Sequence, residues 1–189
     1  MITGPSGVGK GTLIRSLLQQ IPALEVSVSA TTRPPRPGEV DGVDYHFISE
    51  EQFDANLAKG AFIEHATYSG HRYGTMRSEL ESRLKAGIPV VLEIEIQGAR
   101  QVREAMPEAV QVFIAPPSLE ALRARLVGRG TNSPRDMDAR MRTAREEMQA
   151  QDEFAHVVVN DRLERAVGEL VEIVREALRE EGPGTLGAT

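Results

Sequence analysis

A glycine-rich loop near the start of the sequence constrains the fold more than any other feature. The run Gly4-Pro5-Ser6-Gly7-Val8-Gly9-Lys10-Gly11-Thr12 follows a short apolar stretch and precedes Leu13-Ile14, which stand in helical spacing. In such a P-loop, glycines let backbone N–H groups converge on phosphate oxygens, and the helix N-terminus adds its positive end. Lys10 would reach the β- and γ-phosphates of a nucleoside triphosphate. The order strand, loop, helix favours this site over a glycine-rich turn that binds no phosphate.

The loop departs from the strict pattern at the position that normally binds magnesium. Gly11 follows the lysine, and the hydroxyl residue Thr12 comes one place later. A Ser or Thr directly after the lysine is the usual metal ligand. Mg²⁺ readily keeps part of its hydration shell. We therefore expect Mg²⁺ as the cofactor, held mainly through ATP phosphates and water, with no protein metal site.

Composition narrows the class of protein. The chain has 189 residues, enough for one well-buried domain, and contains no cysteine. It has no apolar run near the length of a membrane span and no charged-then-apolar leader, so we expect a cytoplasmic protein without a membrane partner. A net charge of −6 argues against a partner that is nucleic acid.

Hydrophobic periodicity predicts an α/β fold in which helices flank a mostly parallel sheet. Ser49 and Gln52 form a capping box that predicts a helix through Lys59. The first strand, Met1–Thr3, is short for a central strand, so we expect the natural start to lie upstream. The expected strands are 25–30, 90–94, 110–114 and 157–159; the other expected helices are 9–20, 97–106, 118–127, 134–151 and 163–181; and 182–189 is expected to be a disordered tail.

A proline-stiffened segment predicts a second phosphate site. Arg33 and Arg36 lie three residues apart among Pro34, Pro35 and Pro37, which limit how far the backbone can move. Two guanidinium groups near a tyrosine hydroxyl form a good receptor for a phosphate monoester. The alternative is a solvated proline-rich loop, and these residues alone do not decide between the two.

Two carboxylates alternate with apolar residues in the expected strand 90–94 and just beyond it. Glu93 and Glu95 would share one face near the carboxyl end, where ligands collect in open α/β sheets. Buried paired carboxylates are costly, which favours contact with a base, water or a hydrated metal. The alternative is a half-buried strand whose polar face is turned outward.

A series of motifs, in order along residues 2 to about 180, resembles the guanylate kinase family. The matching runs include Gly4–Lys10, Ser27–Arg33, Pro35–Glu39, Gly42–Phe47, Phe62–Glu64, Tyr73–Thr75, Gln97-Gly98, Ile114–Ser118, Arg125–Gly130 and Val159–Asp161. The resemblance implies a single P-loop kinase domain that transfers the γ-phosphoryl group of ATP to GMP, or dGMP, in purine nucleotide metabolism. It also implies a core (1–32, 79–124, 143–181), a mixed-strand GMP-binding subdomain (about 33–78) and a helical lid (about 125–142).

The resemblance also implies the roles of individual residues. ATP would be bound by the run Gly4–Thr12 and by Asn160 on the adenine side. The GMP phosphate would be bound by Arg33, Arg36, Tyr45 and Tyr73, and the guanine by Glu64, Ser29, Thr75, Glu93 and Glu95. One carboxylate can accept from both N1–H and the exocyclic amine of guanine, whereas adenine would leave it unpaired. The family usually has aspartate where Glu95 stands and often where Glu93 stands, so the two glutamates are a departure from the family pattern.

Catalysis is implied for Lys10, for Arg33 and for the lid arginines Arg125, Arg129 and Arg140, which would stabilise charge on the transferring phosphoryl group. No general base is required, because the attacking phosphate oxygen is already ionised. The four histidines are therefore expected to have structural or surface roles.

Two other functions compete with this interpretation. One is a guanylate-kinase-like binding module that uses the fold for peptide partners; the retained Lys10 argues against it. The other is a P-loop kinase for a different small phosphate ester, which the set Glu64, Ser29 and Thr75 disfavours. The sequence leaves monomer and homodimer open.

Overall fold

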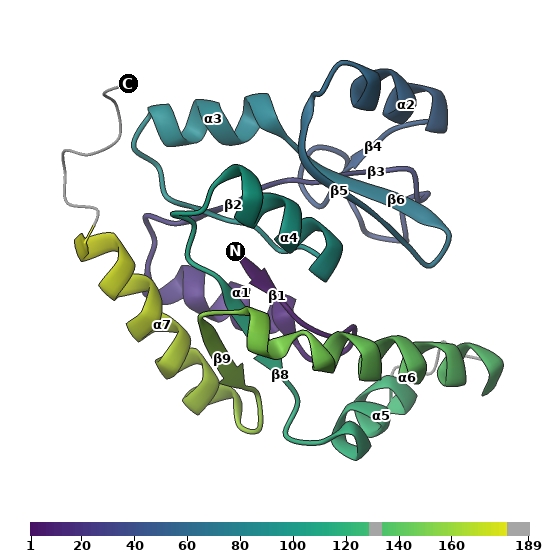
Figure 1. Cartoon of the computed structure of the whole chain (residues 1–189), viewed down its shortest axis with the longest axis vertical. Coiled ribbons are helices and arrows are strands. Elements are labelled where there is room, and N and C mark those ends of the chain that lie inside the picture. Colours follow the sequence, from purple (N-terminus) through teal and green to yellow (C-terminus); the bar gives the residue numbers. More distant parts are fainter. Residues whose placement is uncertain (129–133, 181–189) are drawn as a thin grey trace. The chain divides into compact units, whose positions relative to one another are not determined.

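The computed structural model describes residues 1–128 and 134–180, which form two compact units (Figure 1). Unit 1 comprises Met1–Pro22, Glu93–Ile96 and the described residues from Val110 onward. Unit 2 comprises Ala23–Leu92 and Gln97–Ala109. Within the described residues, no helix is both long and apolar enough to cross a membrane.

Unit 1 is built on a parallel sheet in the order β1-β8-β9. Its strands are β1 (Ile2–Thr3), β8 (Val112–Ala115) and β9 (His156–Val159), with Ile2 opposite Val112 and Val112 opposite His156. All four residues of β8 are buried, as expected for a parallel strand covered on both faces. The helices are α1 (Lys10–Gln20), α5 (Leu119–Gly128), α6 (Pro134–Gln149) and α7 (Leu163–Glu180), with a 3₁₀ turn at Gln151–Glu153.

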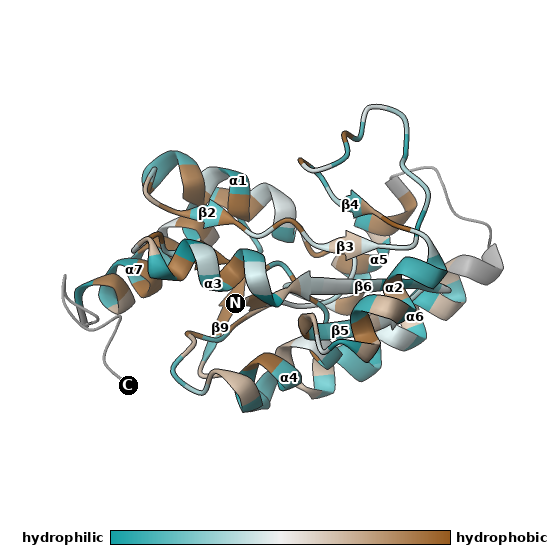
Figure 2. Ribbon diagram, turned by 90° about the horizontal axis from the view of Figure 1, so that it is seen from above, coloured by the Kyte–Doolittle hydropathy of each residue, from teal (hydrophilic) through white to brown (hydrophobic). Residues whose placement is uncertain are grey.

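The core of unit 1 joins this sheet to its helices. Phe113, Leu13, Leu17 and Leu170 are fully buried, and α1 packs against α7. Hydrophobic and hydrophilic residues alternate along α7 in Figure 2, as in a helix with one buried face. Burying one such leucine or phenylalanine contributes about 1.5–3 kcal/mol. This packing fixes the strand and helix that flank the glycine-rich loop.

Unit 2 contains a mixed sheet in the order β4-β3-β6-β5 and a separate parallel pair, β2-β7. Only β3 and β4 run parallel in the four-stranded sheet. Its core contains Phe53 and Phe62, whose rings stack with centroids 4.5 Å apart. The elements are β2 (Glu25–Val26), β3 (Ala30–Thr31), β4 (His46–Phe47), α2 (Glu50–Ala58), β5 (Phe62–Tyr68), β6 (His71–Met76), α3 (Arg77–Lys85), β7 (Val90–Val91) and α4 (Ile96–Ala105).

The expected α/β class is confirmed, and every expected helix forms within two residues of its expected bounds. The strand expected over 25–30 is interrupted, so that β2 and β3 belong to different sheets. The strand expected over 90–94 is also shorter. After β7, only Glu93 forms a bridge, opposite Ile2. The expected tail lies outside the described residues.

Helix α3 and the β5–β6 hairpin were not among the expected elements. The hairpin turns at Ser69 and Gly70, both with positive φ (50° and 78°), as a two-residue hairpin turn requires. A Ser-Gly pair between two runs rich in Tyr, Phe and Thr is the sequence signal for such a turn. Helix α3 carries a single buried residue, Leu80, so its periodicity is weak.

The predicted capping box at α2 is confirmed. Gln52 N donates to Ser49 Oγ (3.2 Å), and Ser49 N donates to Gln52 Oε1 (2.9 Å). Ser49→Ala is expected to lower the free energy of unfolding by about 1 kcal/mol, because an orphan helix N–H loses its acceptor. Urea unfolding would measure the change. Ser82→Ala, on the exposed face of α3, is the control and should change it by less than about 0.5 kcal/mol.

Candidate functional site

The glycine-rich loop of unit 1 is held against the sheet by close backbone contact. Gly4 has φ of 140°, and a Cβ at this position would lie 2.2 Å from the Ile114 carbonyl oxygen on β8. A separation under 3 Å is never adopted by real Cβ atoms, and the clash would be with backbone. Glycine is therefore required where the chain leaves β1.

Two side chains from later in the chain hold the middle of the loop. The Val8 carbonyl oxygen accepts from Asn160 Nδ2 (2.8 Å) and from Arg125 Nη1 (3.0 Å). Arg125 Nη2 also donates to the Asn160 carbonyl oxygen (2.7 Å). With this carbonyl directed at its donors, the loop keeps one backbone conformation. Asn160 and Arg125 thus support the loop, and their adenine-side and catalytic roles stay predictions.

Lys10 is the first residue of α1 and follows Gly9, the N-cap, which has φ of 103°. Its side chain is buried, and Nζ donates to the Gly4 carbonyl oxygen (2.6 Å). The hydroxyl of Thr12 accepts from Arg15 Nη2 (3.2 Å). The lysine therefore lies inside the loop, whereas the Thr12 hydroxyl contacts an arginine side chain.

Three carboxyl groups of unit 1 lie near one another, and two of them, those of Glu93 and Glu147, also lie near the loop lysine. Glu93 is close to Gly11, because a Cβ on that glycine would be 3.7 Å from Glu93 Oε2. Part of the Glu93 side chain is exposed, yet surrounding protein removes water from its carboxyl and so raises its pKa; the charges of Lys10 and Arg15 oppose this rise. Glu95 and Glu147 each have a buried Oε2 without a hydrogen-bond partner among the described residues.

Glu147, on α6, is a member of this group that the sequence analysis did not identify. Burial raises its pKa to about 7, and the negative charge of Glu95 adds to the rise. Lys10 and a hydrogen bond from the Ser6 backbone act in the opposite direction. Glu147 lies seven residues after Arg140, on the same face of α6. Its seven-residue spacing from Arg140, a predicted catalytic residue, is the only sequence signal that could have identified Glu147.

In unit 2, two of the residues predicted to bind the base, Glu64 and Thr75, contact each other. Glu64 on β5 lies opposite Thr75 on β6, and Thr75 Oγ1 donates to Glu64 Oε1 (2.6 Å). Glu64 is 3% exposed and Thr75 is fully buried. A buried carboxylate requires polar partners, and this hydroxyl supplies one. The hairpin thus holds Glu64 in a defined direction.

Three of the predicted phosphate-binding residues lie together in unit 2. The Arg33 guanidinium carbon is 5.3 Å from the centre of the Tyr45 ring, and the Tyr45 and Tyr73 ring centres are 6.0 Å apart. A hydrogen bond to Glu39 raises the pKa of Arg33, and Tyr73 adds a smaller hydrogen-bond contribution. The arrangement places one guanidinium and two phenol rings in a single cluster.

Glu39 organises this cluster and was not predicted as a site residue. Its Oε1 accepts from Arg33 Nη2 (2.8 Å), and its Oε2 accepts from the Arg36 backbone N–H (2.7 Å). The hydrogen bond from Arg33 also lowers the pKa of Glu39. One carboxylate therefore fixes both ends of the proline-rich turn.

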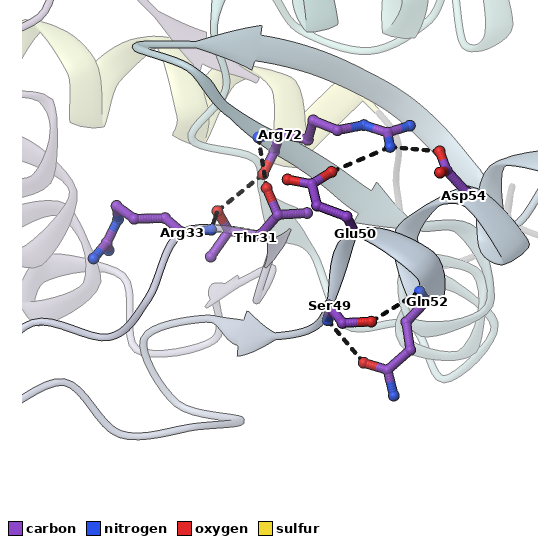
Figure 3. A network of polar contacts seen from close by, with 8 residues as sticks. Thr31, Arg33, Ser49, Glu50, Gln52, Asp54 and Arg72 are labelled. Atoms are coloured by element: carbon purple, nitrogen blue, oxygen red, sulfur yellow. Dashed lines mark hydrogen bonds and ion pairs between the residues drawn. The ribbon is translucent and has the colours of Figure 1, made fainter.

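The Arg33 backbone is fixed separately, through the network drawn in Figure 3. Thr31 Oγ1 accepts from Arg33 N (3.1 Å) and donates to the Arg72 carbonyl oxygen (2.9 Å) on β6. The Arg72 side chain in turn pairs with Asp54 and Glu50 of α2. The start of the Arg33 loop is thus tied to the sheet and, through it, to α2.

The remaining predicted residues are placed as follows. Ser29 is partly buried, and its carbonyl oxygen accepts from His46 N (2.9 Å). The Arg36 side chain is exposed, and Arg140 is partly buried on α6. Arg129 lies outside the described residues. The roles of these four residues in binding or catalysis stay predictions.

Comparison with known proteins identifies the family. The profile of guanylate kinase matches residues 1–177. The chain belongs to the guanylate kinase family.

Curated and solved members of the guanylate kinase family match nearly the whole chain. The guanylate kinase of Frankia casuarinae is 52% identical over 174 residues, covering 92% of this chain and 95% of that protein. That of Rubrobacter xylanophilus is 53% identical over 175 residues, covering 93% and 92%. The crystal structure of guanylate kinase from Anaplasma phagocytophilum has a TM-score of 0.75 at 34% identity and covers 93% of this chain and 82% of that one.

The family activity is ATP-dependent phosphorylation of GMP to GDP, so the predicted enzyme class, a nucleoside monophosphate kinase, is confirmed. The competing interpretations, a binding module and a kinase for another phosphate ester, are not supported by these relatives.

The position of Glu147 predicts a pH dependence of stability. Its pKa is about 7 in the folded chain against an ordinary value of 4.5, so between these values the folded state binds more protons. Stability should therefore fall as pH rises from about 5 to 8, by on the order of 2–3 kcal/mol through this group. Glu147→Gln should remove that part of the fall, as measured by urea unfolding at several pH values.

Glu172→Gln, at an exposed position on α7, is the matched control and should retain the wild-type profile. Parallel profiles for the wild type and Glu147→Gln would show that Glu147 titrates normally.

Proposed function

We propose that unit 1 binds ATP through the loop Gly4–Thr12 and that unit 2 binds GMP, or dGMP, through the Glu64–Thr75 pair and the Arg33 cluster. The observation that carries this assignment is the buried Glu64 carboxylate, oriented by the Thr75 hydroxyl. Burying a carboxylate to 3% exposure costs free energy unless hydrogen-bond donors pair with it, and guanine offers matching donors.

Base selection would come from the direction of these donors. Guanine presents N1–H and the exocyclic amine side by side, and one carboxylate can accept from both. Adenine has an acceptor at N1, so Glu64 would lose the two donors that guanine supplies, at a cost of about 1–3 kcal/mol. Ser29 would approach O6 of the same base, and so would Thr75 on turning its hydroxyl, whose single proton goes to Glu64 in this structure.

The Arg33 cluster would bind the phosphate of GMP. Arg33 brings a planar guanidinium with several donors, and Tyr45 and Tyr73 bring hydroxyl groups from the same cluster. Because Glu39 and Thr31 hold Arg33 before substrate arrives, little side-chain freedom is lost on binding. Arg36 would add a second guanidinium from the exposed side of the turn.

The chemistry is a direct phosphoryl transfer. An ionised oxygen of the GMP phosphate attacks the γ-phosphorus of ATP; the new P–O bond forms as the bond to the β–γ bridging oxygen breaks, and ADP leaves with that electron pair. No proton has to be removed from the nucleophile. Lys10, Arg33, Arg125, Arg129 and Arg140 are proposed to stabilise charge on the transferring group.

Mg²⁺ fits this chain as a hydrated ion. Among the described residues there is no group of three or more His, Cys, Asp or Glu side chains that could hold a metal, and Gly11 stands where a hydroxyl ligand is usual. The partly exposed Glu93 carboxyl near Gly11 would accept from metal-bound water. When bound with ATP, Mg²⁺ neutralises phosphate charge.

The cellular setting also remains a proposal. We infer a cytoplasmic enzyme, since a chain without cysteine needs no oxidising compartment, and a net charge of −6 does not favour a nucleic acid partner. Monomer and homodimer are both compatible with the sequence.

The acceptor preference tests the base assignment. ADP release from ATP and Mg²⁺ would be measured with GMP, dGMP, AMP, CMP and UMP supplied separately. The wild type should turn over the guanine nucleotides well above the others. In Glu64→Ala the preference for GMP over AMP should fall about 10-fold or more, since the carboxylate supplies the discrimination. An unchanged GMP-to-AMP ratio in that variant would contradict the role of Glu64.

The loop lysine is expected to act on the chemical step. Lys10→Ala should lower kcat with GMP by about 100-fold or more while the KM for GMP changes little, because the ammonium acts on the ATP phosphates. Lys85→Ala removes a lysine that is 79% exposed and should leave kcat unchanged. Steady-state kinetics would separate the two parameters; equal losses in both variants would argue against a specific role for Lys10.

A further inference from the structure

Gly98, in the first turn of α4, lies directly against the Glu64 carboxylate. A Cβ on Gly98 would be 2.1 Å from Glu64 Oε2, 2.9 Å from its Cδ and 3.4 Å from its Cγ. The first two separations are below any real Cβ contact. Both residues belong to unit 2. A side chain at Gly98 would therefore have to displace the carboxylate from the position that it shares with Thr75.

One turn later, Gln101 fixes the backbone next to Glu64. Gln101 Oε1 accepts from His65 N (3.0 Å), and Gln101 Nε2 donates to the His65 carbonyl oxygen (2.7 Å). The amide also donates to the Gln97 carbonyl oxygen (3.1 Å), which holds it against its own helix. The Gln101 side chain thus occupies the place that a neighbouring strand would take.

This pairing matters because β5 is an outer strand of the four-stranded sheet. On one side β5 pairs with β6, and on the other side no strand of the described residues pairs with it. Outer strands are the parts of a sheet most able to shift or fray. Gln101 satisfies both groups of His65 and so prevents such movement at the residue after Glu64.

The start of α4 also suits the charge of Glu64. The first N–H groups of a helix have no partner within it, and the helix dipole is positive there. A carboxylate against Gly98, the third residue of α4, is therefore in a favourable field. The close approach that makes this possible requires the absence of a Cβ.

We propose that α4 is the element that aims Glu64 at the guanine base, with Gly98 and Gln101 as positioning residues that determine base specificity. The inference rests on the proposed role of Glu64. Gly98 sets how close the carboxylate lies to the helix, Gln101 sets the strand position, and Thr75 sets the orientation of one oxygen. Neither Gly98 nor Gln101 needs to touch the substrate.

The test compares GMP with IMP, which keeps the guanine N1–H but lacks the exocyclic amine. In the wild type, the ratio of kcat/KM for GMP to that for IMP reports the second hydrogen bond to Glu64. Gly98→Ala should lower this ratio about 10-fold or more by displacing the carboxylate, while the KM for ATP stays within about twofold. Gly168→Ala is the matched control, because Gly168 is also helical and nothing lies within 4 Å of its added Cβ.

A second variant keeps the test decisive where Gly98→Ala lowers folding yield. Gln101→Ala leaves the contact with Gly98 intact, and it should lower the GMP-to-IMP ratio about threefold to tenfold through looser strand placement. Gln149→Ala, at an exposed position on α6, is its control. A uniform loss of kcat/KM for GMP and IMP together, with the ratio unchanged, would indicate general destabilisation and overturn the proposal.

Glu64→Gln, measured in parallel, separates the two levels of inference. If this variant keeps the wild-type ratio, the role of Glu64 fails and the positioning role fails with it. If it abolishes the preference while Gly98→Ala and Gln101→Ala retain it, the proposed function stands and the positioning inference is overturned.

Discussion

The rest of the nucleotide site depends on how the phosphate loop backbone is held. A loop rich in glycine has many accessible conformations and no side chains with which to restrict itself. Here the restriction comes from outside the loop, at the carbonyl oxygen of Val8, which accepts from Asn160 and Arg125. At the other end, Gly4 packs on the Ile114 carbonyl of β8. The donors and the strand lie more than a hundred residues further along the chain, so the loop acquires its shape only when unit 1 is folded.

Buried carboxyl groups are accommodated in two different ways in the two units. Glu64 has a hydroxyl donor and the first turn of α4 beside it, and both favour a charged carboxylate. Glu147 instead lies beside Glu95 with a buried oxygen that lacks a partner among the described residues, and its pKa rises. The first arrangement suits a fixed acceptor of hydrogen bonds. The second makes charge near Lys10 dependent on pH.

The sequence was informative wherever the deciding contacts are local. The glycine-rich loop, the helix that follows it and the capping box of Ser49 and Gln52 all depend on residues within a few positions of one another. Helix α3 was not predicted because Leu80 is its single buried residue, so the helix has no apolar stripe. The strand 90–94 was overestimated because an apolar alternation predicts a strand without showing whether a partner strand is present.

The site residues likewise fall into those that the sequence indicates and those that only the folded contacts reveal. Glu64 was identified only because a family motif contains it. Arg33 was already indicated by its spacing from Arg36 in the proline-stiffened segment, and the family motif decided between a phosphate site and a solvated loop. Glu39, Gln101 and Glu147 act on the site only through folding: Gln101, for example, bonds a backbone 36 residues away. A polar residue on a helix surface is usually solvated. No local sequence pattern distinguishes such a residue from one that holds a strand in place. Such residues become visible only when the contacts themselves are known.

The position of Arg125 changes how kinetic data on this enzyme should be interpreted. An arginine near a P-loop is readily assigned to the transferring phosphate on the basis of its chemistry. Its guanidinium here donates to two backbone carbonyl oxygens, those of Val8 and Asn160, which support the loop. Removing it would release the loop as well as any contact with the phosphate. A fall in kcat when Arg125 is replaced thus combines the loss of loop support with the loss of a phosphate contact. Only a double-mutant cycle with a substitution at Asn160 would separate the two.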